Sequence, residues 1–231
     1  MQSKFDGDRA REYAVQSRIA PAGYDACHEL AACLLAASLG RGGEAHILVA
    51  GVGGTAQEIL VAGRLEPGWR FTGVDPSAPM LELARRSLDN AAMGTRADLR
   101  LGAVSDLPED ARFDATTLIG VLHHVSGREA KRALLDAIRT RLAPGAPMIL
   151  AGNRHSYASR PLFLAAWRER WRMSGAADAE IEAKIGKILQ GAEPPQSDAD
   201  VEDLLVQSGF EPPTLFFSSL FWGGWITQRV R

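Results

Sequence analysis

Residues 46–60, HILVAGVGGTAQEIL, decide the fold of this chain. The apolar run at 46–50 predicts a buried strand of a parallel sheet that helices cover on both faces. Gly51 and Gly53 then allow a sharp turn and let the main chain approach a ligand closely. Residues 55–58, Thr-Ala-Gln-Glu, match a capping box that opens a helix, whose free N–H groups would face that ligand. The stretch therefore predicts a strand, a turn and a helix that hold a nucleotide-like molecule.

Length and charge favour one α/β domain over residues 1–231. A chain of 231 residues can bury one sizeable core, but it is too short for a cofactor domain and a full second domain. Its 26 Lys and Arg nearly balance 28 Asp and Glu, so the net charge of −2 attracts neither nucleic acid nor an anionic membrane. No signal peptide or membrane-spanning run is apparent. We expect a cytoplasmic protein that acts on a small molecule, and the sequence leaves a homodimer open.

Alternating apolar and helical runs predict a Rossmann-like, doubly wound sheet. Five parallel strands are expected at 45–50, 70–74, 98–101, 113–119 and 146–152, with helices near 56–61, 79–90 and 127–142. Residues 215–230 predict two antiparallel strands joined near Gly223 and Gly224. A helical N-terminal extension is expected over 1–42, where Leu30, Leu34 and Leu35 form an apolar stripe of a helix at 24–39. Residues 153–197 are expected to form a cap.

Asp75 ends the second predicted strand, and its carboxylate can accept hydrogen bonds from both hydroxyls of a ribose. The alternative is that Asp75 only caps the next helix, for which Ser77 is the better candidate. The turn also fits the looser dinucleotide fingerprint, so an NAD(P)-dependent reductase is an alternative function. A Tyr-x-x-x-Lys pair would mark such a reductase, but Pro161 stands four residues after Tyr157.

The whole pattern resembles the class I S-adenosylmethionine-dependent methyltransferases. The resemblance is carried by the glycine turn, by Asp75, by Leu-His-His at 122–124 and by Leu-x-Pro-Gly at 142–145. The acid and third glycine usual in the family's first motif are replaced by Val49 and Thr55, and a family aspartate after the third strand is replaced by Ala103. The resemblance implies S-adenosylmethionine as cofactor, held by Tyr24, Gly51, Gly53, Thr55, Asp75, Pro76, Met80, Ala103, Val104 and Ile119.

Within this class the chain is most similar to the branch that contains carboxy-S-adenosylmethionine synthase. The similarity rests on SRIAPAGY at 17–24, on Gly209-Phe210 and on the aromatic strands that follow. In that branch the tyrosine of the Pro-Gly-Tyr motif contacts the sulfonium cofactor, which implies this role for Tyr24. Two of the branch's site residues, an asparagine and an arginine, align with Ile119 and near Leu204. These differences favour ordinary transfer to a small molecule.

Methyl transfer depends mainly on how the acceptor and the cofactor are positioned, because the sulfonium already carries an activated methyl group and the leaving group is a neutral thioether. His123 is a candidate base for an acceptor that must lose a proton, and a histidine that only packs in the structure is the alternative. Tyr157 is the second catalytic candidate. Asn153 and Arg154 are the substrate candidates, because they follow the fifth strand at the sheet edge where ligands bind. No metal site is expected, because no third ligand stands at a suitable spacing from His123 and His124.

Two further functions stay open. One is attack at another carbon of the sulfonium, by 3-amino-3-carboxypropyl transfer or by intramolecular cyclisation that releases methylthioadenosine. The other is a relative that binds the cofactor without turnover. In the cap, Phe163, Trp167 and Trp171 recur every four residues, which predicts a core-facing stripe of a helix. Cys27 and Cys33 are expected to be reduced and buried.

Overall fold

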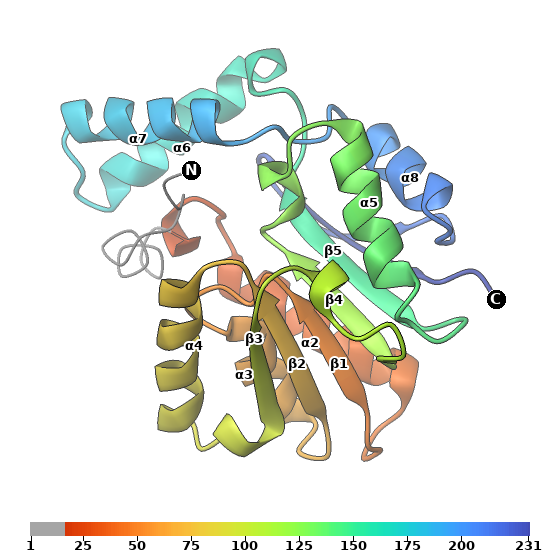
Figure 1. Cartoon of the computed structure of the whole chain (residues 1–231). Helices are drawn as coiled ribbons and strands as arrows, with labels where there is room; N and C mark the ends of the chain where they lie inside the picture. Colours follow the sequence, from red (N-terminus) through yellow and green to blue (C-terminus); the bar gives the residue numbers. More distant parts are fainter. Residues whose placement is uncertain (1–16) are drawn as a thin grey trace.

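A computed structural model of the chain describes residues 17–231, and the first sixteen residues of the predicted extension lie outside this range. Its sheet has the strand order β3-β2-β1-β4-β5-β7-β6 (Figure 1). The first five strands run parallel, and β7 and β6 finish the sheet in antiparallel pairs. The predicted Rossmann-like sheet with an antiparallel C-terminal pair is therefore confirmed.

The parallel strands agree with the predicted runs to within a few residues. They are β1 (His46–Ala50), β2 (Arg70–Asp75), β3 (Ala97–Leu101), β4 (Ala115–Ile119) and β5 (Pro147–Asn153). Three short 3₁₀ helices follow or precede them: η1 (Gly94–Arg96), η2 (Val104–Asp106) and η3 (Leu122–His124). The order places the carboxyl ends of β1, β2 and β4 next to one another, where ligands bind in sheets of this kind.

The turn between the last two strands is not where the sequence predicted it. β6 covers Thr214–Ser219 and β7 covers Trp222–Gln228, so the turn lies at residues 220–221, with Leu220 at φ +49°. Gly223 and Gly224 lie inside β7. A β-carbon on Gly223 would come within 2.4 Å of the Trp225 ring, and one on Gly224 within 2.9 Å of the Phe216 ring. The glycines make room for aromatic rings, and the prediction took them for a turn signal.

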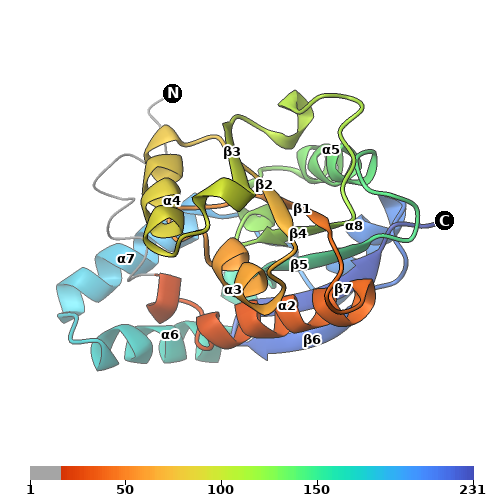
Figure 2. The same ribbon diagram turned by 90° about the horizontal axis from the view of Figure 1, so that it is seen from below.

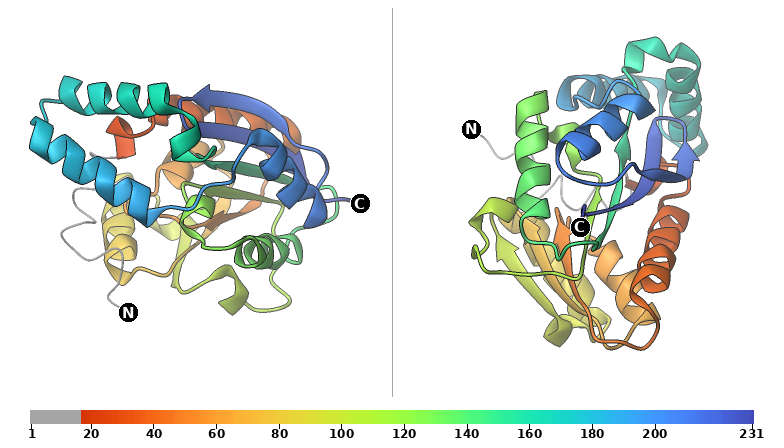
Figure 3. Two further views of the ribbon diagram at one scale, coloured as in Figure 1. Left: turned by 90° about the horizontal axis from the view of Figure 1, so that it is seen from above. Right: turned by 90° about the vertical axis from the view of Figure 1, so that its right-hand side faces the viewer.

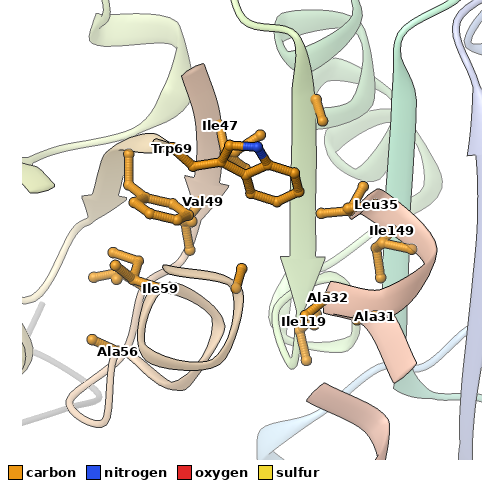
Figure 4. Close-up of a cluster of buried hydrophobic side chains, with 14 of the residues drawn as sticks. Ala31, Ala32, Leu35, Ile47, Val49, Ala56, Ile59, Trp69, Ile119 and Ile149 are labelled. Carbon is orange, nitrogen blue, oxygen red and sulfur yellow. The ribbon is translucent and has the colours of Figure 1, made fainter. Parts of the chain in front are cut away.

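Helices cover both faces of the sheet (Figure 2). One face carries α2 (Tyr24–Leu39), α3 (Gln57–Leu65) and α4 (Ala78–Asn90), and the other carries α5 (Arg128–Arg139) and α8 (Asp198–Gln207). Ile47 and Val49 of β1 pack in the first layer, together with Ile59 (Figure 4). Leu48 and Ala50 pack in the second layer. This alternation follows from the two-residue period of a strand.

Helix α2 has the bounds that the sequence predicted, but its buried side differs. Leu35 is buried, whereas Leu30 is 44% exposed, because Ala31 and Ala32 make the close contact with the sheet. Cys27 is buried and Cys33 is exposed, and both are free thiols. The prediction of two buried thiols was therefore wrong for Cys33. Burial raises the pKa of the Cys27 thiol to about 12.

The cap consists of η4 (Tyr157–Ser159), α6 (Pro161–Met173) and α7 (Asp178–Gly191). Helices α6 and α7 lie side by side beyond the carboxyl ends of the strands (Figure 3). Trp167 and Trp171 are buried among Ile181, Ile185 and Phe221, which confirms that their stripe faces a core. Among residues 17–231, no helix is long and apolar enough to cross a membrane.

Candidate functional site

The turn after β1 has a backbone that favours glycine at two positions. Gly51 has φ +80° and Gly53 has φ +58°, both in the left-handed region. A β-carbon on Gly51 would come within 2.2 Å of Val121 Cγ2. The N–H groups of Gly51 and Val52 donate to the carbonyl of Val74 at 2.8 and 3.1 Å, so the turn folds back onto β2.

The predicted capping box at 55–58 does not form. Helix α3 begins at Gln57 after Ala56, which has φ +48° and provides no side-chain cap. The Thr55 hydroxyl lies 3.0 Å from the hydroxyl of Tyr24. The threonine at the family's third glycine position therefore ties the turn to the start of α2, a partner 31 residues away that local sequence does not reveal.

Asp75 fixes the same turn from the neighbouring strand. One carboxylate oxygen accepts the Gly53 N–H at 3.0 Å and the other accepts the Ser77 N–H at 2.9 Å. Burial raises the pKa of Asp75, and these two hydrogen bonds oppose the shift. The Ser77 hydroxyl caps α4 by accepting the Met80 N–H at 3.4 Å, as predicted. Each carboxylate oxygen keeps further acceptor capacity for a ribose hydroxyl.

The end of β3 lies beside Asp75, because Gly102 N–H donates to the Asp75 carbonyl at 3.1 Å. The Asp106 carboxylate accepts the Ala103 N–H at 2.8 Å and so closes the turn after β3. Val104 is buried. Of the other predicted cofactor residues, Pro76 is exposed after β2, and Met80 is buried where a β-carbon on Gly54 would come within 3.2 Å of its sulfur.

A small cavity of about 10 Å³ lies beneath the glycine turn. It brings together five predicted cofactor residues, which are Tyr24, Gly51, Gly53, Thr55 and Ile119. The sequence analysis missed the other residues of its lining, which are His28, Val52, Glu58, Gly120 and Trp222. A buried acid in the first turn of a helix looks like an ordinary exposed position in a sequence, because acids are common at helix N-termini.

A large cavity of about 470 Å³ opens next to the small one. Its walls come from the N-terminal segment, the loop after β4, the end of β5, the cap and β7: Ser17, Ala20, Pro21, Tyr24, Gly120, His123, His124, Asn153, Trp167, Trp171, Lys184, Lys187, Ile188, Gln190, Gly191, Ala192 and Trp222. Tyr24, Gly120 and Trp222 line both cavities. A ligand that spans the glycine turn therefore reaches the large cavity at these three residues.

His123 is buried at the border of the large cavity, with its ring edge-on to that of Trp222 at 6.1 Å. The Asn153 N–H donates to its Nδ1 at 3.3 Å. A ring nitrogen that accepts a hydrogen bond carries no proton, so this contact assigns the proton of the neutral ring to Nε2. Nδ1 is engaged with the backbone of β5, and the predicted role of His123 as a base remains a prediction.

Asn153 and Tyr157 form a pair behind the cavity wall. The Asn153 side-chain amide donates to the Tyr157 hydroxyl at 2.8 Å, and its Oδ1 is buried with no hydrogen-bond partner in the described part of the chain. Tyr157 lies in the cap core, with its ring edge-on to Phe221 at 5.0 Å, and burial raises its pKa. Only Asn153 lines the large cavity, with Tyr157 in contact behind it, and the catalytic role of Tyr157 stays a prediction.

Arg154 lies away from both cavities. Its N–H donates to the Phe221 carbonyl at 2.7 Å, its guanidinium pairs with Asp198, and it also donates to the Ser218 hydroxyl at 2.6 Å. The guanidinium also lies over the Trp225 ring at 5.5 Å. The antiparallel strand beside β5 turns this residue to α8, and Arg154 lines neither cavity, so its contact with a substrate stays a prediction. In residues 17–231, no three His, Cys, Asp or Glu side chains converge as they would around a metal ion.

Comparison with known proteins finds a family match for the central part of this chain. A family model described as a methyltransferase domain matches residues 48–148, from β1 into β5. A comparison with curated protein sequences found no match.

Three solved structures illustrate the likeness of fold. An O-methyltransferase family 2 protein from Planctomyces limnophilus, solved with apigenin, has a TM-score of 0.71 and 16% identity over 99% of this chain and 63% of its own. RosA from Streptomyces davawensis, a dimethyltransferase of an amino-riboflavin, has a TM-score of 0.59 and 18% identity over 80% of this chain and 49% of its own. A methyltransferase from Methanosarcina mazei has a TM-score of 0.58 and 18% identity over 81% of this chain and 93% of its own.

The chain spans between 49% and 63% of the length of the first two of these neighbours. At such identities the likeness concerns the fold, and the family model covers the strands that carry the glycine turn and Asp75. Residues 48–148 thus match a methyltransferase domain model, and the whole chain has a Rossmann-like fold that its methyltransferase neighbours share.

Proposed function

We propose that this chain is an S-adenosylmethionine-dependent methyltransferase whose acceptor is a small planar molecule. One observation carries the proposal: a glycine turn held by Asp75 stands at the carboxyl edge of the sheet and shares three lining residues with a cavity of about 470 Å³. A cofactor on the turn and an acceptor in the cavity would meet at Tyr24, Gly120 and Trp222.

The residues at this edge fit the proposed cofactor. Gly51 and Gly53 carry no side chain and line the small cavity, so a ligand there can approach the backbone of the turn. Asp75 provides acceptors for ribose hydroxyls, and the turn at Ala103 and Val104 lies beside it for the adenine. The methionyl part would then extend over β1 toward β4, where Tyr24 and Ile119 line the small cavity. The bound cofactor supplies an activated methyl group.

The large cavity has the size and walls of a small-molecule site. Cavities of about 300–1,000 Å³ lined by apolar and aromatic side chains are typical of such sites. Here the lining includes three tryptophans, Trp167, Trp171 and Trp222, of which the first two also pack in the cap core. Two polar atoms of lining residues, Trp171 Nε1 and Asn153 Oδ1, are buried without a hydrogen-bond partner among residues 17–231. The first needs a hydrogen-bond acceptor and the second a donor, and a polar substrate that reached them would provide both. The neighbours solved with apigenin or acting on an amino-riboflavin also handle planar aromatic molecules.

Catalysis at this site would rest on position. An in-line arrangement of acceptor atom, methyl carbon and sulfur supplies most of the acceleration, and the acceptor's proton needs a base only if it does not ionise by itself. With Nδ1 of His123 held by the Asn153 N–H, we assign this histidine to holding the β4 loop against β5 at the cavity border. Asn153, fixed by Tyr157, orients the acceptor.

Calorimetry with S-adenosylmethionine and S-adenosylhomocysteine tests the cofactor assignment, with NADPH as the control ligand. We expect the two sulfur ligands to bind at micromolar concentrations and NADPH not to bind. If neither sulfur ligand binds at tens of micromolar, the proposal is refuted. Incubation with the cofactor and a set of phenols and aromatic amines then tests transfer by a mass increase of one methyl group. Release of methylthioadenosine would instead indicate cleavage of another carbon–sulfur bond.

A further inference from the structure

Glu58 is an acid in an unusual place, under the glycine turn rather than on the surface. It stands in the first turn of α3, its side chain is 8% exposed, and it lines the small cavity with Gly51, Gly53 and Gly120. Acidic side chains are almost never this buried unless a partner compensates the charge. The partners that the fold provides therefore decide what Glu58 does.

In the described part of the chain, Glu58 has no strong cationic partner. His28 of α2 places Nε2 3.9 Å from a carboxylate oxygen, which is too long for a hydrogen bond. The other ring nitrogen of His28 donates to the Tyr24 carbonyl at 2.8 Å, since a carbonyl only accepts, so the neutral ring presents a bare nitrogen to Glu58. No Lys or Arg in residues 17–231 pairs with Glu58 within 4 Å.

Among the described residues, the charges that act on Glu58 itself are acidic, whereas Arg18 and Asp25 act on its neighbour His28. Asp75 on β2 and Cys27 on α2 both interact with the Glu58 charge, and Tyr24 lines the same cavity. Burial raises the pKa of Glu58 to about 8, while burial lowers the pKa of His28 to about 4. At neutral pH the free protein therefore holds a proton on Glu58 and none on the imidazole. Arrival of a cation in the cavity would reverse this balance by favouring the carboxylate.

Size and position select the cation. A cavity of about 10 Å³ has room for one group of the size of a water molecule, such as an ammonium, and none for a ring. Asp75 on β2 takes the ribose end of the proposed cofactor, and the small cavity lies on the other side of β1, between its turn and the end of β4. The amino-acid end of the cofactor extends in that direction.

We infer that Glu58 is the anionic partner of the amino group of S-adenosylmethionine, and that cofactor binding drives the proton of Glu58 into solvent. This inference rests on the proposed function. It also bears on the acid missing from the end of β1, where Val49 stands: a carboxylate from α3 supplies negative charge beneath the same turn. The ammonium would keep its three protons and donate a hydrogen bond to the Glu58 carboxylate. The buffer would take up the proton that Glu58 releases.

The test is calorimetry on the full chain at about pH 6.5, in two buffers with different enthalpies of ionisation, using three ligands. S-adenosylmethionine carries the sulfonium and the amino group, S-adenosylhomocysteine only the amino group, and methylthioadenosine neither. Wild-type protein should release about one proton per molecule of the first two ligands and none with the third. This count requires no variant, and an absence of proton release would overturn the inference.

Glu58→Gln gives the second readout, with Glu29→Gln as a matched control that removes one exposed acid from α2. Glu58→Gln should bind the two amino-acid ligands about 10- to 100-fold more weakly and methylthioadenosine as the wild type does. Glu29→Gln should change neither. The inference would be overturned if Glu58→Gln bound all three ligands equally more weakly, or if it bound S-adenosylmethionine as the wild type does. Failure of the wild-type chain to bind any of the three ligands would instead refute the proposed function itself.

Discussion

The glycine-turn edge of the sheet and the helical cap face each other across the large cavity, yet they are built in different ways. The edge depends on main-chain conformation, with Gly51 and Gly53 in left-handed geometry and Asp75 accepting a backbone N–H. The cap depends on bulk, with Trp167, Trp171 and Phe221 packed in a small core. The first arrangement tolerates few side chains, whereas the second needs only apolar residues of suitable total volume.

This difference assigns separate tasks to the two regions. A cofactor that is the same in every reaction suits a fixed backbone site, while an acceptor that differs from enzyme to enzyme suits a wall of exchangeable side chains. Damage to one region should therefore leave the binding property of the other intact. The following changes test that separation.

Gly51→Ala should damage the turn most. The substitution forces a side chain into φ +80° and brings it within 2.2 Å of Val121, so we expect a loss of about 2–6 kcal/mol and no cofactor binding. Gly40→Ala is the matched control, because Gly40 has φ +87° but nothing within 4 Å of its β-carbon position. Urea denaturation and calorimetry measure both. Equal losses in the two variants would show that contact with Val121 is unimportant.

Ile185→Ala should loosen the cap and spare the turn. Ile185 is 1% exposed in the cap core, and a cavity left at such a site costs about 2–5 kcal/mol. Hydrogen exchange should accelerate across 157–191, while S-adenosylmethionine affinity changes less than about twofold. Leu189→Ala, on the same helix but 41% exposed, should have little effect. A large loss of cofactor affinity in Ile185→Ala would contradict the separation of the two regions.

Asp75→Ala should weaken cofactor binding more than Tyr24→Phe does. The first change leaves two N–H groups without acceptors, at about 1–3 kcal/mol each, and removes the ribose contacts. The second loses one hydroxyl contact to Thr55. Calorimetry with S-adenosylhomocysteine compares them. Wild-type affinity in Asp75→Ala would overturn its assignment as a cofactor residue.

Glu58 and His28 should leave opposite marks on the pH dependence of folding stability. The folded pKa of Glu58 is raised to about 8, so its contribution to stability is complete below its ordinary value of 4.5 and is lost as pH rises toward 8. The folded pKa of His28 is lowered to about 4, so its contribution is complete above 6.5 and is lost as pH falls toward 4.

Glu58→Gln should therefore gain stability over the wild type steadily from about pH 4.5 to 8, measured by urea denaturation at several pH values. The variant should also retain the rise in stability from about pH 4 to 6.5 that His28 produces. Glu29→Gln is the control again. A constant difference between Glu58→Gln and the wild type across this range would show that the Glu58 carboxyl is not perturbed in the folded protein.

Features fixed by neighbouring residues could be predicted from the sequence. The bounds of α2, the left-handed glycines and the cap by Ser77 depend on the local chain, and the structure has them as expected. The parallel strands could also be located, because strands covered on both faces are apolar along their whole length.

Features fixed by residues far away in the sequence could not be predicted in this way. The Thr55 hydroxyl turns to Tyr24 rather than to the helix it precedes, Arg154 turns to Asp198 because β7 lies beside β5, and Glu58 is buried by α2. In each case the residue type fits an ordinary local role, and only the packing of another element shows a different one. The capping box and the turn at Gly223 were wrong for this reason.

The antiparallel finish of the sheet has a consequence for how the chain reaches its native state. β5 is an interior strand of the completed sheet, but its partner β7 lies about 70–80 residues further along the chain, and the cap and α8 are made in between. During synthesis the β5 edge stays open until residues 222–228 arrive, and an open edge is a template for wrong pairing. Pairing of β7 with β5 is therefore the folding step that closes this edge. Slow pairing would leave the edge exposed and the chain prone to aggregation.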